Sequence, residues 1–136
     1  FGGLFVVMRA VDEAGLARMV VSQLAGDLSR VDGTTLARLG VAVTLLSQAV
    51  SNVPAVMLFA PSLEGPGRPE ILWLGLAAFS TLAGNLTVIG SVANVIVFET
   101  ARREGVMVGF GEYLRIGIPV SATTFLLAWL ILFRLG

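Results

Sequence analysis

Three long stretches without a charged side chain constrain this chain more than any other feature of its sequence. They cover residues 39–63, 71–98 and 116–133, and are 25, 28 and 18 residues long. A hydrocarbon core of about 30 Å is crossed by roughly 20 apolar residues in an α-helix. Each stretch is therefore at or near the length needed to cross a membrane.

The overall composition also favours a membrane over water as the surrounding solvent. Hydrophobic residues make up 56% of the 136 residues, charged residues make up 13%, and the mean hydropathy is +0.90. A soluble domain has about 45–50% apolar and about 25% charged residues. The apolar runs are too uniform to leave a helical bundle with a polar outside. We therefore expect an all-α, polytopic membrane protein fragment, opening on a truncated apolar run at 1–8.

The charged and reactive residue types exclude several functions. The nine basic residues are all arginine and are matched by nine acids, and the sequence contains no lysine, histidine or cysteine. It therefore offers no imidazole or thiolate nucleophile, no Schiff-base lysine and no zinc site of the usual cysteine and histidine kind. Nucleic-acid binding would need a basic stripe, whereas these arginines are scattered. We expect no enzyme activity, no catalytic residue, no nucleic-acid partner and no cofactor other than an ion.

The N-terminal part predicts two helices of different character. A membrane-spanning helix is expected to end within 1–10, because Arg9 and the acids after it would cost roughly 3 kcal/mol each at the bilayer centre. Residues 11–26 carry apolar side chains at helical spacing and predict an amphipathic helix at the membrane interface. Thr34 or Thr35 is expected to cap the helix that follows.

The first charge-free stretch is interrupted at its centre by polar residues and a proline. Ser51 and Asn52 are followed by Val53 and Pro54. A proline inside a helix kinks it and frees carbonyl groups in the preceding turn. Two geometries follow: one kinked spanning helix, or a re-entrant hairpin over 34–62 whose arms are each too short to cross the bilayer.

A second interruption follows a loop at 60–70 that is rich in proline and glycine. The second stretch would be about 42 Å long as one helix, which exceeds what the bilayer requires. Its centre, GNLTVIGS at 84–91, favours unwound backbone, with the glycines expected to supply freedom in φ. Residues 69–104 therefore predict a discontinuous transmembrane helix. A last transmembrane helix is expected at 113–135, with small residues that serve helix packing.

Two broken segments with serine and asparagine at each break are typical of a transporter binding site. The candidate substrate- or ion-binding residues are Ser51, Asn52, Val53, Gly84, Asn85, Thr87, Gly90, Ser91 and Asn94. A sodium ion would be held by uncharged oxygens of Ser51, Asn52, Thr87 and Ser91. Helix N-termini could bind an anion instead. The alternative is that these side chains only connect neighbouring helices by hydrogen bonds.

The two breaks carry motifs that resemble the ion transporter superfamily. The motifs are LSQAVSNVPAVML at 46–58 and GNLTVIGSVANVIV at 84–97. The superfamily includes divalent anion/sodium symporters, citrate transporter-like proteins, arsenical pump permeases and one class of sodium/proton antiporter. The resemblance covers nearly the whole chain. It implies the C-terminal member of two inverted repeats, each with a re-entrant hairpin and a broken helix.

The resemblance also implies roles for particular residues. Ser51 and Asn52 correspond to the ligands at the hairpin tip, and 84–91 to the unwound stretch that faces them. It thereby favours the hairpin over the kinked span. Val53 and Pro54 stand where a threonine is common in the symporters, a form closer to the arsenite and uncharacterised anion-transporter branches.

These observations predict a secondary active transporter of small anions that works by alternating access and is either cation-coupled or not. The alternatives are an arsenite/antimonite efflux permease, a sodium/proton antiporter or, more remotely, a non-transporting membrane subunit. The expected partners are a small inorganic or carboxylate anion, the lipid bilayer, the N-terminal repeat of the same protein and a second copy in a homodimer. The expected location is the bacterial inner membrane. Arginine counts and the resemblance imply opposite orientations, so sidedness stays open.

Overall fold

The computed structural model describes residues 2–28, 30–64 and 69–136, and these residues contain helices but no strand. The expectation of an all-helical fold is confirmed. In chain order the elements are α1 (Gly2–Glu13), α2 (Leu16–Ala25), α3 (Gly33–Val50), α4 (Asn52–Leu63), α5 (Glu70–Ala83), η1 (Val88–Gly90), α6 (Val92–Arg103) and α7 (Phe110–Leu135).

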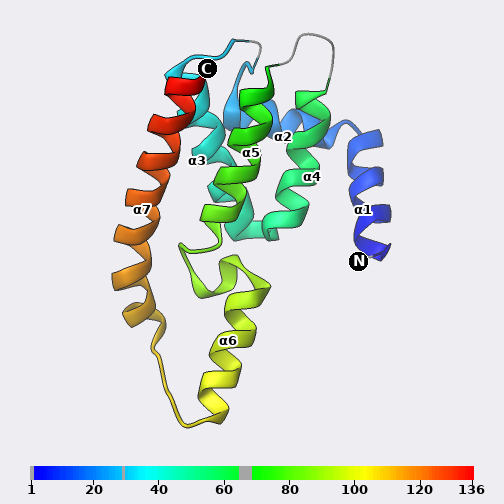
Figure 1. The fold of residues 1–136 in the computed structure, drawn as a ribbon. Helices are drawn as coiled ribbons and strands as arrows, with labels where there is room; N and C mark the ends of the chain where they lie inside the picture. Colours follow the sequence, from blue (N-terminus) through cyan, green and yellow to red (C-terminus); the bar gives the residue numbers. More distant parts are fainter. Residues whose placement is uncertain (1, 29, 65–68) are drawn as a thin grey trace.

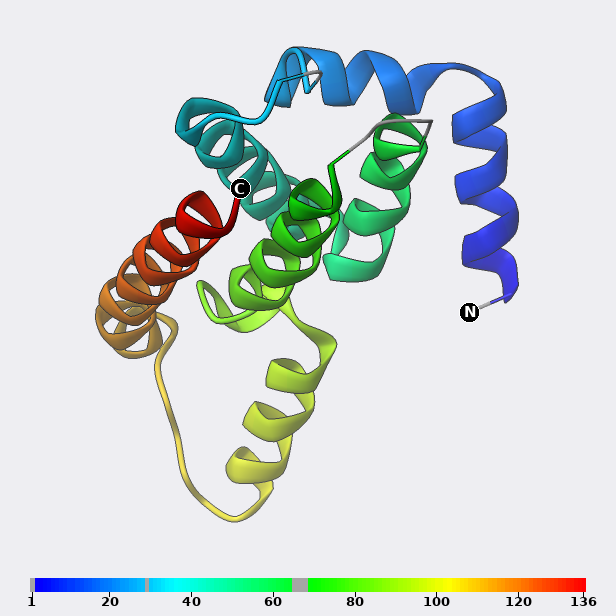
Figure 2. The same ribbon diagram turned by 45° about the horizontal axis from the view of Figure 1, so that its top comes forward.

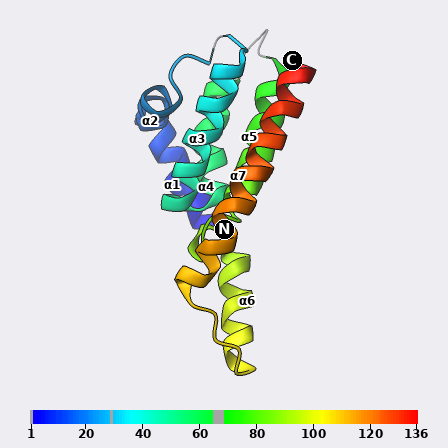
Figure 3. The same ribbon diagram turned by 90° about the vertical axis from the view of Figure 1, so that its left-hand side faces the viewer.

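The helices form an elongated bundle with two distinct ends (Figure 1). α3 leaves one end, and α4 returns to the same end after reversing about halfway along the bundle. α5 leads away again and, after an interruption, α6 continues to the opposite end. The chain returns past α6 as a loop, and α7 then runs back toward the first end beside α5 and α3 (Figure 3). α2 lies across the first end, and α1 packs against α2 and α4 at the side (Figure 2).

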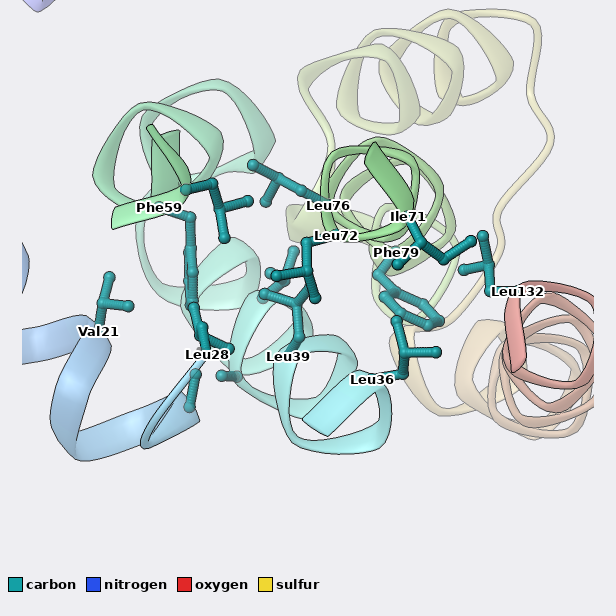
Figure 4. Packing of buried hydrophobic residues seen from close by; sticks show 14 residues of the cluster. Val21, Leu28, Leu36, Leu39, Phe59, Ile71, Leu72, Leu76, Phe79 and Leu132 are labelled. Atoms are coloured by element: carbon teal, nitrogen blue, oxygen red, sulfur yellow. The ribbon is translucent and has the colours of Figure 1, made fainter. Parts of the chain in front are cut away.

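The core lies where α3, α4 and α5 meet, and α7 and α2 cover it (Figure 4). Phe59 from α4 and Phe79 from α5 are fully buried there beside leucines of α3 and α5. Gly75 of α5 is buried against α3, where a Cβ atom would lie 3.4 Å from Cδ2 of Leu39, within ordinary van der Waals contact. This packing holds the ends of α3 and α5 in a fixed relation, and those ends carry the candidate site.

α7 is joined to α3 at two levels. The indole nitrogen of Trp129 donates a 2.8 Å hydrogen bond to the carbonyl of Gly33, the first residue of α3. One turn of α7 earlier, Phe125 stacks on Phe79 with 4.6 Å between ring centroids and lies against Gly40, where a Cβ atom would overlap the ring. The small residue in α3 therefore makes room for the aromatic residue of α7.

One helix among the described residues, α7, is long and apolar enough to cross a membrane by itself. Its 26 residues rise about 39 Å in an α-helix. α2, α4 and α5 are apolar but shorter, with 10 to 14 residues each. α5 runs beside α7, whereas α6 extends beyond the start of α7 toward the opposite end of the bundle (Figure 1).

The first helix continues beyond the expected boundary near residue 10. α1 runs to Glu13, and Arg9 pairs with Glu13 one turn later at 2.9 Å on an exposed face. The chain then turns at Gly15, whose φ of 73° is in the left-handed region that favours glycine. The amphipathic helix α2 begins only at Leu16, so residues 11–13 belong to the preceding helix.

The cap of α3 differs from the expectation. Asp32 is the N-cap, and its Oδ1 accepts a 2.6 Å hydrogen bond from the backbone N–H of Thr35. The prediction that Thr34 or Thr35 provides the cap is therefore wrong. Because this N–H group stabilises the charged carboxylate, the pKa of Asp32 lies below its ordinary value of 3.8.

The prolines of the first charge-free stretch fall inside α4. Pro54 is the third residue of α4, where the backbone N–H would have no partner within the helix. It therefore causes no kink, and the chain reverses before it, at Ser51. Pro61 lies inside α4, which runs to Leu63, so the predicted loop at 60–70 begins later than expected. Residues 65–68 of that loop lie outside the described residues.

Candidate functional site

The turn between α3 and α4 consists of one residue, Ser51. Its N–H donates to the carbonyl of Ser47 and ends α3, while its carbonyl accepts from the N–H of Ala55 and begins α4. Its φ of 76° and ψ of 162° fall in a region that is essentially restricted to glycine. Such a conformation costs on the order of 1–3 kcal/mol and persists where the surroundings hold it in place.

The second break lies between α5 and α6, as the sequence predicts. α5 ends at Ala83, and the chain turns before the short helix η1. Thr87 is the N-cap of η1, because its hydroxyl oxygen accepts a 3.0 Å hydrogen bond from the N–H of Gly90. Ser91 is extended and stands directly before α6. The interruption is therefore ordered structure with its own cap.

The hairpin turn and the second break meet although about 35 residues separate them in the chain. Gln48, in the last turn of α3, donates a 2.7 Å hydrogen bond from Nε2 to the carbonyl of Ala83. Its Oε1 accepts a 2.6 Å hydrogen bond from the hydroxyl of Thr87. Asn52, at the start of α4, lies against Gly84, where a Cβ atom would be 3.2 Å from Nδ2 of Asn52.

The glycines of the second break allow close approach and do not supply unusual φ values. Gly84 has a right-handed φ of −61°, and Gly90 has no positive φ. A Cβ atom at Gly90 would lie 2.7 Å from Oε1 of Gln48, closer than such atoms can be. The expectation that these glycines provide freedom in φ is therefore wrong. They leave room for side chains of the hairpin.

The carbonyl groups of the unwound stretch are satisfied by side chains. Asn94 of α6 donates from Nδ2 to the carbonyl of Gly84 at 2.6 Å and to that of Thr87 at 3.3 Å. The same nitrogen lies 3.2 Å from the hydroxyl oxygen of Tyr113, in the first turn of α7. Tyr113 in turn donates a 3.2 Å hydrogen bond to the carbonyl of Asn85. Asn94 is thus placed as an internal support for the break.

Asn52 is a candidate residue whose buried side-chain oxygen has capacity left for a ligand. Its Oδ1 is buried and has no hydrogen-bond partner among the described residues. Buried polar oxygens are nearly always hydrogen-bonded, so an unpartnered one is a reason to look for a ligand or for a missing part of the protein. The hydroxyl of Thr87, by contrast, uses its only hydrogen for Gln48 and also accepts from Gly90.

The remaining candidate residues differ in how far their side chains are buried. Ser51 and Ser91 are half-buried, and Ser91 lies beside Asn52 near Gly84, where a Cβ atom would be 3.3 Å from its Cβ. Val53 is 45% exposed. The side chain of Asn85 is also exposed. This residue contributes its backbone carbonyl to the junction, the region where the hairpin turn at 48–52 meets the second break at 83–91.

The junction is uncharged. The flanking ionic groups lie away from it, as in the exposed pairs of Glu99 with Arg102 and Arg103 at the end of α6. No group of three or more histidine, cysteine, aspartate or glutamate residues able to hold a metal occurs in the described part of the chain. The polar groups available to a ligand are therefore neutral oxygens, amides and backbone N–H groups.

Two residues of the junction are absent from the sequence-based candidates. Gln48 is a polar residue in an apolar helix, three and four residues before Ser51 and Asn52, and this proximity is the signal that could have identified it. Tyr113 lies about 20 residues beyond the second break at the start of another helix, and no local pattern connects the two.

Comparison with known proteins identifies a family. The family model described as arsenical pump membrane protein matches residues 1–135. A 46 kDa membrane protein of Mycobacterium leprae is 34% identical over 140 residues, which cover 94% of this chain and 32% of that protein. No solved structure matches the chain.

Two eukaryotic relatives carry names that refer to transport. A putative transporter arsB of Dictyostelium discoideum is 32% identical over 139 residues, covering 100% of this chain and 24% of the relative. A silicon efflux transporter of Oryza sativa subsp. japonica is 39% identical over 111 residues, covering 76% and 22% respectively. The chain thus spans a third or less of the length of these relatives. By the match over nearly all of its residues, the chain belongs to the arsenical pump membrane protein family, within the ion transporter superfamily that its two motifs resemble.

Proposed function

We propose that this chain is the C-terminal repeat of a secondary active transporter that moves a small inorganic oxyacid or its anion across a membrane by alternating access. The observation that carries the proposal is the meeting of the hairpin turn and the broken helix through Gln48, Thr87, Asn52 and Gly84. Discontinuous helices that meet in this way bring unpaired polar groups together inside an apolar bundle.

The arrangement of the helix ends supports a re-entrant hairpin. α3 and α4 have 18 and 12 residues and rise about 27 and 18 Å, so neither matches a core of about 30 Å. Both open toward the same end of the bundle, and their turn lies near the level of the second break (Figure 1). A membrane around α7 would then place Ser51 and Asn52 near its midplane.

The neutral polar groups of the junction fit two forms of substrate. Backbone N–H groups in the first turn of α4 have no partner within the helix and suit an oxyanion. The buried Oδ1 of Asn52 requires a donor, such as the hydroxyl of a protonated oxyacid or a coupling cation. Both forms are small and need no charged side chain in the site.

Arsenite or antimonite efflux is the second candidate function, and a specific observation favours it. The family description names an arsenical pump, and a relative from rice is named as a silicon efflux transporter. Arsenous and silicic acids are neutral near pH 7 and carry several hydroxyl donors. An uncharged site with a free buried acceptor at Asn52 matches this chemistry.

Sodium coupling has less support among the proposed ligands. Of Ser51, Asn52, Thr87 and Ser91, the hydroxyl of Thr87 already makes two hydrogen bonds. The carbonyls of Gly84, Asn85 and Thr87 also accept side-chain donors. A sodium ion at this junction would therefore rely on Ser51, Asn52 and Ser91, and on ligands from the N-terminal repeat.

Further parts of the proposal concern the assembly. We expect the N-terminal repeat of the same protein to complete the site from the opposite side, and a bacterial inner membrane to surround both repeats. A homodimer is a further expectation. The apolar side chains exposed on α6 and α7, such as Ile96 and Ile116, then face lipid or the other repeat.

The test is a flux assay on the full protein in liposomes, with arsenite, silicate, inorganic oxyanions and dicarboxylates offered with and without a sodium gradient. Sodium-independent movement of arsenite or silicate would support the efflux candidate. Sodium-dependent uptake of a carboxylate or oxyanion would support a cation-coupled anion transporter. Absence of flux for every substrate, in liposomes that retain correctly inserted protein, would count against transport by this protein.

A further inference from the structure

Side-chain hydrogen bonds hold the backbone of the junction in place. Four carbonyls near the end of α5, from Ala83, Gly84, Asn85 and Thr87, each accept a hydrogen bond from a side chain. The donors come from three different helices. Asn94 and Tyr113 belong to helices that follow the break, whereas Gln48 belongs to the hairpin.

Gln48 is the side chain that joins the hairpin to the second break by hydrogen bonds. Its amide donates through Nε2 to Ala83 and accepts through Oε1 from Thr87, at 2.7 and 2.6 Å. A leucine offers neither group, an ionised glutamate only accepts and a lysine only donates, so none of the three could make both bonds. The amide of Gln48 carries a donor and an acceptor and so fits both partners.

The hydrogen bond between Thr87 and Gln48 also affects the backbone of the second break. Having donated its hydrogen to Gln48, the Thr87 hydroxyl presents a lone pair to the N–H of Gly90, which closes η1. Gly90 has no side chain at the place where a Cβ atom would collide with the Gln48 amide. One side chain of the hairpin thus influences the residues between the end of α5 and the start of α6.

We infer that Gln48 is a positioning residue that locks the hairpin turn to the broken helix, acting through Thr87, so that the two breaks move as one body during transport. This inference rests on the proposed function and adds to it a residue that need not touch the substrate. Asn52, four residues after Gln48, would contact the substrate. Gln48 would hold the second break, on the opposite side of the site, at a fixed distance from Asn52.

The first experiment measures amide hydrogen exchange in the full protein, in detergent or liposomes, without any substrate. Gln48→Leu removes both hydrogen bonds, and Thr87→Val removes the hydroxyl at nearly constant volume. In each variant, exchange in the segment 84–91 should become about tenfold faster. Thr87→Ser keeps the hydroxyl and should retain slow exchange.

Two matched substitutions control for general damage. Gln23→Leu changes the other glutamine of the chain, which is exposed on α2. Thr100→Val changes an exposed threonine of α6 whose hydroxyl only bonds within its own helix, to Ile96. Neither should alter exchange in 84–91. Unchanged exchange in both Gln48→Leu and Thr87→Val would overturn the inference, whether or not the protein transports anything.

The second experiment tests the connection to transport with the substrate identified by the flux assay. Gln48→Leu and Thr87→Val should each raise the apparent KM about tenfold. The effect of the double variant should be smaller than the product of the two single effects, since the bond between Thr87 and Gln48 is already lost in either one. Thr87→Ser should restore the wild-type KM. Additive losses would show that the two residues act separately and would refute the inference, whereas a wild-type protein without flux would refute the proposed function.

Discussion

The amide nitrogen of Asn94 lies 2.6 Å from the carbonyl oxygen of Gly84, so a side chain of α6 closes the gap that the break leaves at the end of α5. An α-helix leaves its last carbonyls without partners inside the helix. Inside a membrane, water cannot reach them, and each unsatisfied group would cost several kcal/mol. At the membrane depth that we propose for the break, Asn94 therefore stabilises the interrupted helix.

The first prediction concerns this support. Asn94→Leu should lower the thermal stability of the full protein by about 1–3 kcal/mol, since it leaves the carbonyl of Gly84 without its side-chain donor. The carbonyl of Thr87 loses a 3.3 Å bond but keeps its bond from the N–H of Gly90. Asn85→Leu is the matched control, because the Asn85 side chain is exposed. Equal melting temperatures for the two variants would contradict the role given to Asn94.

The second prediction separates binding from stability at Asn52. Asn52→Ala should reduce transport about ten- to a hundredfold, because a ligand would lose its hydrogen bond to Oδ1. The amount of protein inserted in the membrane and its melting temperature should change little, since Oδ1 has no partner within the described residues. Wild-type flux in Asn52→Ala would mean that the residue serves only packing.

The third prediction uses the backbone of Ser51. Ser51→Gly should raise stability by about 0.5–1 kcal/mol, because glycine adopts the φ of 76° without a clash. Ser51→Ala removes the hydroxyl but keeps the strain, so it should not be more stable than the wild type. Comparing the flux of the two variants then shows whether the hydroxyl or the backbone conformation matters. A destabilised glycine variant would contradict the strained turn.

The fourth prediction concerns the space beside Gln48. Gly90→Ala should destabilise the protein by about 1–3 kcal/mol, since the added methyl group would lie 2.7 Å from Oε1 of Gln48 and force the amide away from Thr87. Gly111→Ala, at the start of α7, places a methyl group where no atom lies within 4 Å and should be harmless. Thermal unfolding of both variants in detergent provides the comparison.

The fifth prediction is a pH dependence at the start of α3. The pKa of Asp32 is lower in the folded protein, so its ionised cap stabilises α3 above the ordinary pKa of 3.8. This contribution should be lost as the pH falls through the lower, folded-state pKa. Asp32→Asn keeps a capping side chain without a titrating group. The stability difference between wild type and variant should therefore shrink as the pH falls from above 3.8 through the lower, folded-state pKa, and a constant difference would argue against the cap.

Local sequence patterns located most of the breaks correctly. The polar residues at 84–91 indicate unwound backbone because glycine and β-branched residues are poor helix formers, and the structure interrupts the helix there. The patterns were less accurate where a tertiary contact or a cap decides. They assigned the cap of α3 to a threonine, and they began the following loop at residue 60 although α4 runs to Leu63.

Helical structure, apolar lengths that suit a bilayer and two interruptions by neutral polar residues are all predicted from the sequence, because they follow from composition and from the local preferences of each residue. The polar groups that remain without a hydrogen-bond partner are seen only in the folded chain. Gln48, Asn94 and Tyr113 reach the second break from α3, α6 and α7, and their hydrogen bonds depend on distances set by packed helices. No pattern along the chain records those distances, so the distinction between the supporting residues and Asn52 becomes visible only in the folded protein.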